Sequence, residues 1–119
     1  MHQIAAAKIR ILFGSEIAIG PGKAALLEAI RAGGSISSAA RDLGMSYKRA
    51  WNLVDTMNRC FREPLVDTAT GGGGGGGAQL TDFGTQVLRH YRSMEKRTDT
   101  AIRRDLTAFA ALLADQPKA

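Results

Sequence analysis

The stretch around Gly44 has apolar residues at helical spacing on both sides of the glycine, and this pattern predicts two short helices joined by a tight turn. The first helix is expected over residues 36–43 and the second from residue 47 to 61 or 62, with Ser35 and Ser46 as their N-caps. The expected buried positions are Ile36, Ala39, Ala40, Leu43, Ala50, Leu53, Val54, Met57 and Phe61. Two helices in this arrangement are typical of a helix-turn-helix, which offers its second helix to the DNA major groove.

The N-terminal region has a different pattern. Residues 8–13 and 16–19 carry β-branched and charged side chains around the turn signal Gly14-Ser15, which predicts a short hairpin. A helix over residues 5–13 is the alternative. The hairpin would place Ile9, Ile11 and Phe13 on one face of its first strand, and Ile17 and Ile19 inward on its second.

A further helix is expected between this hairpin and the helix pair. Proline is tolerated in the first turn of a helix, so the helix should begin near residues 21–23, and Gly33-Gly34 should end it. Its predicted apolar stripe is Ala25, Leu26, Ala29 and Ile30.

The segment after Pro64 has the pattern of a second hairpin. Two short extended runs, residues 65–68 and 78–80, flank seven consecutive glycines from Gly71 to Gly77. Glycines in this number specify no conformation, so we expect a mobile loop at the hairpin tip. A hairpin placed directly after a recognition helix is a wing.

From Asp82 the apolar spacing is helical almost to the end of the chain, with Thr81 as the N-cap. The stripe comprises Phe83, Val87, Tyr91, Met94, Thr98, Ile102, Leu106, Phe109 and Leu113. Thr98 lies in a charged stretch, so a kink or break there is an alternative to a continuous helix. A continuous helix to Ala114 would be ~50 Å long, which exceeds what so small a domain can bury, so its outer part is expected to pack against another chain.

These elements predict a mainly α fold with a small β component (α+β). The architecture is a winged helix-turn-helix with an N-terminal β-hairpin and a long C-terminal dimerisation helix. Residues 1–80 would form the DNA-binding domain, and residues 81–119 the C-terminal helix that serves as the dimerisation element.

Charge and cysteine content narrow the class of protein. Lys plus Arg outnumber Asp plus Glu by 16 to 11, and residues 1–64 hold nine of the basic but only five of the acidic side chains. The basic excess therefore coincides with the predicted helix-turn-helix, where it permits contact with phosphates. The single cysteine, Cys60, favours a reducing compartment, and no apolar run approaches the ~20 residues that span a bilayer. We expect a cytoplasmic protein with no membrane partner.

The start of the second helix of the pair carries the candidate chemistry. Side chains there reach the groove floor, where Arg and Lys pair with guanine and Asn with adenine. The candidate DNA-binding residues are Ser46, Tyr47, Lys48, Arg49, Asn52, Ser35, Arg41, Thr70, Gly71 and Gly72. The alternative is a structural helix pair with a solvated basic face. Trp51 is expected to anchor the core or the wing rather than to stack on bases, because buried aromatic area dominates small cores.

Other chemistry has little support in the sequence. The glycine run lacks the lysine that a phosphate-binding loop places after its last glycine, so it is either a loop that lies close to DNA or a spacer. His2, His90 and Cys60 show no metal-ligand spacing, and no nucleophile, base and orienting acid are apparent. We therefore expect no metal, no cofactor and no enzymatic activity.

Four runs of the sequence together resemble a known family. They are GPGKAALLEAI, GSISSAARDLGMSYKRAWNLVDTMN, PLVDTATGGGGGGG and AQLTDFG, and they are similar to the N-terminal domain of the molybdate-responsive ModE-type transcription regulators. That domain is related to the winged helix-turn-helix of LysR-type regulators. The resemblance covers roughly residues 20–94, and it implies a winged-helix DNA-binding domain, dimerisation through N- and C-terminal elements and transcriptional regulation. It also supports residues 46–49 as recognition-helix positions and residues 70–77 as the wing.

Family members that sense molybdate carry it in C-terminal oxyanion-binding domains. This chain ends at Ala119 after one long predicted helix, so we expect a stand-alone DNA-binding domain with no identifiable small-molecule effector. The expected function is a sequence-specific, ModE-like transcription regulator, linked to molybdenum or oxyanion metabolism, that binds double-stranded DNA as a homodimer. The alternatives are a winged-helix module that binds another protein, and a molybdate sensor.

Overall fold

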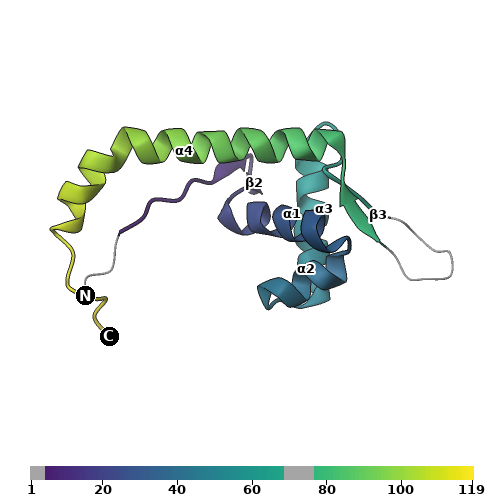
Figure 1. The fold of residues 1–119 in the computed structure, drawn as a ribbon, viewed down its shortest axis with the longest axis horizontal. Coiled ribbons are helices and arrows are strands. Elements are labelled where there is room, and N and C mark those ends of the chain that lie inside the picture. Colours follow the sequence, from purple (N-terminus) through teal and green to yellow (C-terminus); the bar gives the residue numbers. More distant parts are fainter. Residues whose placement is uncertain (1–4, 69–76) are drawn as a thin grey trace.

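A computed structural model of the chain describes residues 5–68 and 77–119, and Figure 1 shows their arrangement. The elements in chain order are β1 (Ile11–Phe13), β2 (Glu16–Ile19), α1 (Pro21–Gly33), α2 (Ile36–Leu43), α3 (Tyr47–Cys60), β3 (Val66–Thr68), β4 (Ala78–Leu80) and α4 (Asp82–Ala110). The three shorter helices pack beneath the first half of α4, and the β3–β4 hairpin extends from one end (Figure 1). The predicted α+β winged helix-turn-helix, with an N-terminal hairpin and a long C-terminal helix, is confirmed. Within the described ranges, no helix is both long and apolar enough to cross a membrane.

The core lies where α1 meets α2, α3, β4 and the start of α4. Ala39 and Ala40 of α2 are buried, and their short side chains let this helix approach its neighbours closely. Gly44 closes α2 with a φ of 67°, as predicted. Leu43 was expected in the core but is exposed, because α2 ends there and Met45, beyond the turn, packs against the core.

The buried face of α1 differs from the predicted stripe. Ala24 and Leu27 are fully buried, whereas Ala25 and Ala29 are only partly buried. Elements on several sides of α1 cover it, namely β2, α2, α3, β4 and α4, so its buried surface is wider and rotated from the predicted one.

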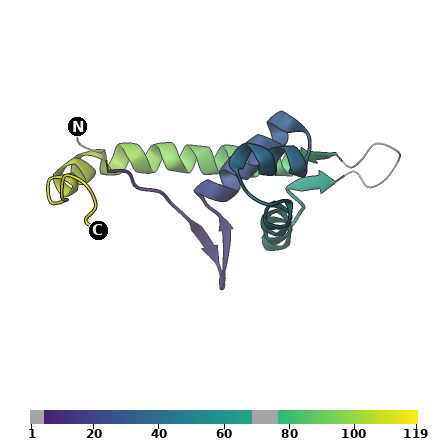
Figure 2. The same ribbon diagram turned by 90° about the horizontal axis from the view of Figure 1, so that it is seen from below.

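The predicted N-terminal hairpin forms, with a first strand that begins at Ile11 rather than at residue 8, and the alternative helix over residues 5–13 is wrong. Ile19 is buried, but Ile17, which was expected inward, is exposed, as are Ile11 and Phe13. The pairing register shifts between residues 11 and 12, and a bulge of this kind changes which side chains share a face. The hairpin also projects away from the helices (Figure 2), so its buried residues, Ala18 and Ile19, lie at the end of β2, and Ile9, just before β1, packs against the core.

Helix α4 is continuous through Thr98 and ends at Ala110, short of the predicted Ala114. An ion pair between Arg103 and Asp99, with a separation of 2.8 Å, links successive turns of the charged stretch where a break was an alternative. Its buried residues are Gly84, Leu88 and Tyr91, all in the first half. Figure 1 shows the second half continuing beyond the other helices and bending at its end.

Candidate nucleic-acid interface

Both helices of the helix-turn-helix begin at a serine cap, as predicted. The Ser46 Oγ accepts a hydrogen bond of 3.1 Å from the backbone N–H of Arg49, and the Ser35 Oγ accepts one of 3.0 Å from Ser38. A hydroxyl that accepts a hydrogen bond still holds its own proton, so each cap can also donate to a phosphate oxygen. The partial positive charge of a helix N-terminus favours an anion at the same place.

The first turns of α3 present five of the predicted residues to solvent. Ser46, Tyr47, Lys48, Arg49 and Asn52 are all exposed. Four of the five line a shallow hollow together with one core-facing neighbour; the lining residues are Ser46, Lys48, Arg49, Asn52 and Leu53. The structure therefore brings hydroxyl, ammonium, guanidinium and amide donors onto one end of the helix.

Two cations lie at this end of α3. Among the described residues, Lys48 and Arg49 form no ion pair, whereas Arg59, near the other end of α3, pairs with Asp55 at 3.0 Å. The charge of a surface cation without an acidic neighbour is not offset locally, so the cation is available to bind a phosphate or a guanine edge. The available positive charge of α3 is thus concentrated at its N-terminus.

The other predicted residues that the structure describes, Ser35 and Arg41, belong to α2 and its N-cap. Ser35 is partly buried at the start of α2, and Arg41 is exposed in the same helix. Thr70, Gly71 and Gly72 lie outside the described residues, as does the rest of the predicted mobile glycine tip up to residue 76. The roles of these five residues at DNA stay predictions.

The exposure of Trp51 corrects the interpretation made from the sequence. It was expected to anchor the core or wing, but 46% of its surface is exposed on α3, and 54% of Tyr47, one turn earlier, is exposed as well. The buried stripe of α3 is Ala50, Val54 and Met57, so Trp51 lies one position off that stripe. The sequence did contain a signal for this: the apolar stripe of α3 is complete without Trp51, which indicates that Trp51 faces outward.

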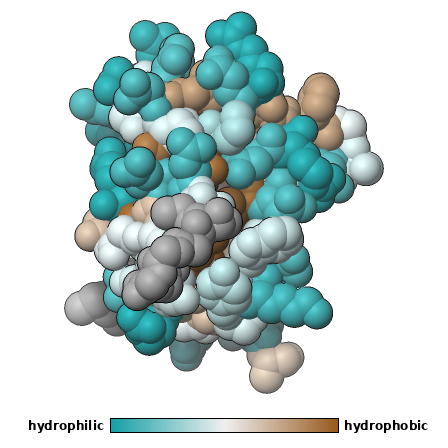
Figure 3. Space-filling model, turned by 90° about the vertical axis from the view of Figure 1, so that its right-hand side faces the viewer, coloured by the Kyte–Doolittle hydropathy of each residue, from teal (hydrophilic) through white to brown (hydrophobic). Residues whose placement is uncertain are grey.

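The base of the wing is held against the helix-turn-helix. Strands β3 and β4 pair antiparallel, with Asp67 opposite Gln79. The backbone N–H of Ala78 in β4 donates a 2.9 Å hydrogen bond to the carbonyl of Gly34, at the corner between α1 and α2. Thr81 caps α4, and its hydroxyl also donates to the carbonyl of Pro64 at 2.7 Å. Viewed from the wing end, polar side chains cover most of this face, with apolar ones visible between them (Figure 3).

No candidate metal-binding site is present in the part of the chain that the structure describes. No group of three or more His, Cys, Asp or Glu side chains is arranged there to hold a metal ion. Cys60, at the end of α3, is a partly buried free thiol.

Comparison with known proteins identifies the family of this helix-turn-helix. The model described as "Bacterial regulatory helix-turn-helix protein, lysR family" matches residues 23–85, more than half of the chain. The matched range runs from α1 to the first turn of α4 and so contains the helix-turn-helix and both wing strands.

Three curated relatives have similar sequences. The "Molybdenum transport protein ModE" of Azotobacter vinelandii is 45% identical over 79 residues, which is 66% of this chain and 29% of the relative. The "Molybdenum-pterin-binding protein MopB" of Rhodobacter capsulatus is 47% identical over 77 residues, covering 65% and 28%. The "DNA-binding transcriptional dual regulator ModE" of Escherichia coli K12 is 41% identical over 71 residues, covering 60% and 27%. The matching region thus spans less than a third of the length of each of these relatives.

Proposed function

We propose that this chain, which belongs to the lysR family of bacterial regulatory helix-turn-helix proteins, binds double-stranded DNA sequence-specifically and regulates transcription. The observation that carries the proposal is the exposed N-terminal end of α3, where Lys48 and Arg49 have no acidic partner among the described residues and Asn52 lies beside them. This combination suits the major groove, because guanidinium and ammonium groups pair with guanine and a carboxamide pairs with adenine.

Each proposed contact has a chemical role. Arg49, Lys48 and Asn52 would read base edges, whereas Ser46 and Tyr47 would donate hydroxyl protons to phosphates. The remaining candidates would contact the backbone or the minor groove from α2 and the wing; they are Ser35, Arg41, Thr70, Gly71 and Gly72. Backbone contacts would fix the register of α3 on the duplex, and base contacts would supply the sequence preference.

The relatives suggest which genes this regulator controls. All three have names that refer to molybdenum or to ModE, and one is named as a DNA-binding transcriptional dual regulator. We propose that the DNA sites of this chain lie near genes for molybdenum or oxyanion handling. A genome-wide binding footprint would support this if sites cluster at such genes, and sites scattered without that association would argue against it.

We also propose that the chain acts as a homodimer. Apart from Tyr47 and Trp51 on α3, the most exposed apolar residues lie on the N-terminal hairpin and at or just beyond the end of α4; they are Leu12, Phe13, Phe109, Leu112 and Leu113. Apolar patches of this kind mark protein interfaces. A two-fold dimer would place two copies of α3 in successive major grooves about 34 Å apart.

Replacement of Arg49 tests the base-reading role directly. Loss of a bidentate guanine contact costs about 1–3 kcal/mol of binding free energy, so Arg49→Ala should lose sequence preference while its helical content is unchanged. Gel shifts on a specific and a scrambled duplex at several salt concentrations measure this. The control is Arg89→Ala, which removes the same charge from the exposed surface of α4.

Two outcomes would contradict the proposal. If the unmodified chain shows no salt-sensitive binding to any genomic fragment, it is not a DNA-binding protein under these conditions. If Arg49→Ala and Arg89→Ala weaken binding to both duplexes equally, Arg49 supplies only charge.

The second candidate function is a protein-binding module, favoured by the exposed Tyr47 and Trp51. A flat salt dependence with tight capture of a protein partner would distinguish it.

A further inference from the structure

The side chain of Asn58 joins the recognition helix to the wing. Asn58 lies in the last turn of α3 and is partly buried. Its Oδ1 accepts hydrogen bonds from the backbone N–H groups of Leu65 and Val66, at 2.8 and 3.3 Å. Its Nδ2 donates to the carbonyl oxygen of Val66 at 3.2 Å. One carboxamide thus binds both backbone polar groups of Val66, the first residue of β3.

These bonds replace a missing neighbour strand. Val66 is opposite Leu80 in the β3–β4 ladder, and the next ladder hydrogen bond towards the base runs from Thr81 N–H to the carbonyl of Leu65. Polar groups alternate between the two edges of a strand, so the N–H and C=O of Val66 point away from β4. Unpaired groups on such an edge are costly to bury, and the Asn58 amide satisfies them as a neighbouring strand would.

The wing base is therefore attached at two points, one on each strand: at α3 and at the corner between α1 and α2. Strand β3 is bound by Asn58 of α3, and β4 is bound through Ala78 to the carbonyl of Gly34, next to the start of α2. Asn58 is 12 residues along the chain from Ser46, so about 18 Å of helix separates the wing attachment from the base-reading end. The placement of the wing relative to the base-reading end of α3 therefore depends on the orientation of the wing base at Asn58.

We propose that Asn58 is a positioning residue that holds the wing at a fixed orientation to α3, so that the two contact one DNA site in register. This inference rests on the proposed DNA binding for its consequence, but the orientation itself is a property of the free protein. Asn58 does not contact DNA in this proposal. It acts through the backbone of β3.

The first experiment uses the full chain without DNA. Residual dipolar couplings of backbone amides in α3, β3 and β4 report whether helix and wing share one orientation. In the unmodified protein one alignment tensor should fit all three elements. Asn58→Leu has a similar shape but none of the three hydrogen bonds, and its β3 and β4 couplings should no longer fit the tensor of α3. Asn58→Asp keeps an acceptor for the two N–H groups, so it should deviate less than Asn58→Leu.

A stability control separates positioning from general loosening. Leu26→Val removes one methylene from a fully buried residue of α1 and leaves the Asn58 hydrogen bonds intact. It should lower the melting temperature while the couplings of α3 and the wing still fit one tensor. If Asn58→Leu keeps the single tensor, or if Leu26→Val perturbs the wing equally, the positioning role is wrong.

The second experiment adds DNA and tests the consequence. With Asn58→Leu, hydroxyl-radical protection on the wing side of the footprint should weaken, guanine protection in the major groove should remain, and affinity should fall roughly tenfold as backbone contacts are lost. A footprint that weakens evenly along its length would overturn the register argument. Absence of any footprint with the unmodified chain would refute the proposed DNA binding, whereas the couplings in the free protein would still decide the role of Asn58.

Discussion

At the scale of single residues, Gly84 shows how closely α4 approaches the start of the wing. A Cβ added at Gly84 would lie 2.1 Å from the carbonyl oxygen of Leu65, which is far inside any normal contact. Gly84→Ala should therefore force α4 and β3 apart and lower the free energy of unfolding by about 1–3 kcal/mol, the usual cost of overpacking. Chemical denaturation measures the change.

Gly22→Ala is the matched control for this prediction. Gly22 lies in the first turn of α1, and a Cβ there would meet no atom within 4 Å. Alanine is a better helix former than glycine, so this variant should be as stable as the unmodified protein or gain up to ~1 kcal/mol. Equal stability of Gly84→Ala and Gly22→Ala would show that the approach of α4 to Leu65 is not tight.

The role of a residue could be predicted from the sequence where its cause is local, and could not where its cause lies in a distant segment. The caps Ser35, Ser46 and Thr81 were predictable, because a cap depends on a side chain and an amide three residues away. The roles of Gly84 and Asn58 were not, because each depends on a backbone segment that only the fold brings near. Nothing in the local sequence distinguishes Asn58 from Asn52, which lies exposed on the same helix.

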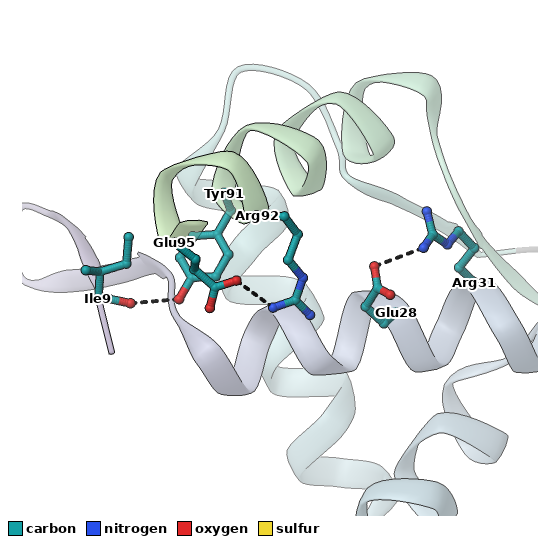
Figure 4. A network of polar contacts seen from close by, with 6 residues as sticks. All are labelled: Ile9, Glu28, Arg31, Tyr91, Arg92 and Glu95. Carbon is teal, nitrogen blue, oxygen red and sulfur yellow. Dashed lines mark hydrogen bonds and ion pairs between the residues drawn. The ribbon is translucent and has the colours of Figure 1, made fainter. Parts of the chain in front are cut away.

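At the scale of elements, Tyr91 connects the N-terminal segment to α4. The Tyr91 side chain is fully buried, and its hydroxyl donates a 2.8 Å hydrogen bond to the carbonyl of Ile9 (Figure 4). Burial raises the pKa of Tyr91 above its ordinary value of 10.0, and the negative charge of Glu95 raises it further. The neutral phenol is thus favoured in the folded protein.

This pKa shift gives a pH dependence of known sign. Because the folded pKa is the higher one, the stabilisation is fully present below about pH 10 and is lost as pH rises through the folded pKa. Tyr91→Phe should cost about 1 kcal/mol of unfolding free energy at pH 7, from the lost hydrogen bond, and should remove the part of the alkaline decline that Tyr91 causes. Tyr47→Phe, at an exposed tyrosine, should leave both quantities unchanged, and denaturation curves from pH 7 to 11 compare the three proteins.

Most elements could be predicted because helical and strand periods are visible along the chain. The failures lie where an element ends or turns away from the core. Leu43 belongs to the apolar stripe of α2 by spacing, yet no spacing rule shows that the helix stops at that residue. In the N-terminal hairpin, the shifted register between Ile11 and Leu12 changed the faces that simple alternation assigned.

At the scale of the whole molecule, the second half of α4 gives the chain an elongated shape. The longest dimension is 56 Å, and the radius of gyration is 17.1 Å. A compact chain of this length would have a radius of gyration of about 13–14 Å. The end of α4 also carries Phe109, which is 56% exposed, and just beyond the helix Leu112 is 80% exposed. An extended helix with apolar side chains at its end gains stability when a second copy covers them, which is the physical basis of the proposed homodimer.

Placing a charge in this apolar end should separate the dimer. Phe109→Glu would bury a carboxylate against apolar side chains of the second copy, so sedimentation of this variant should show a monomer at concentrations where the unmodified chain is a dimer. Thr107→Glu adds the same charge two residues earlier on a different face of α4, and it should remain dimeric. Because a two-fold dimer binds two half-sites together, Phe109→Glu should also lose affinity for a two-fold site while its binding to a single half-site is unchanged. If the unmodified chain sediments as a monomer and binds a single half-site as tightly as a two-fold site, the end of α4 is not a dimer interface, and its apolar residues meet a different partner.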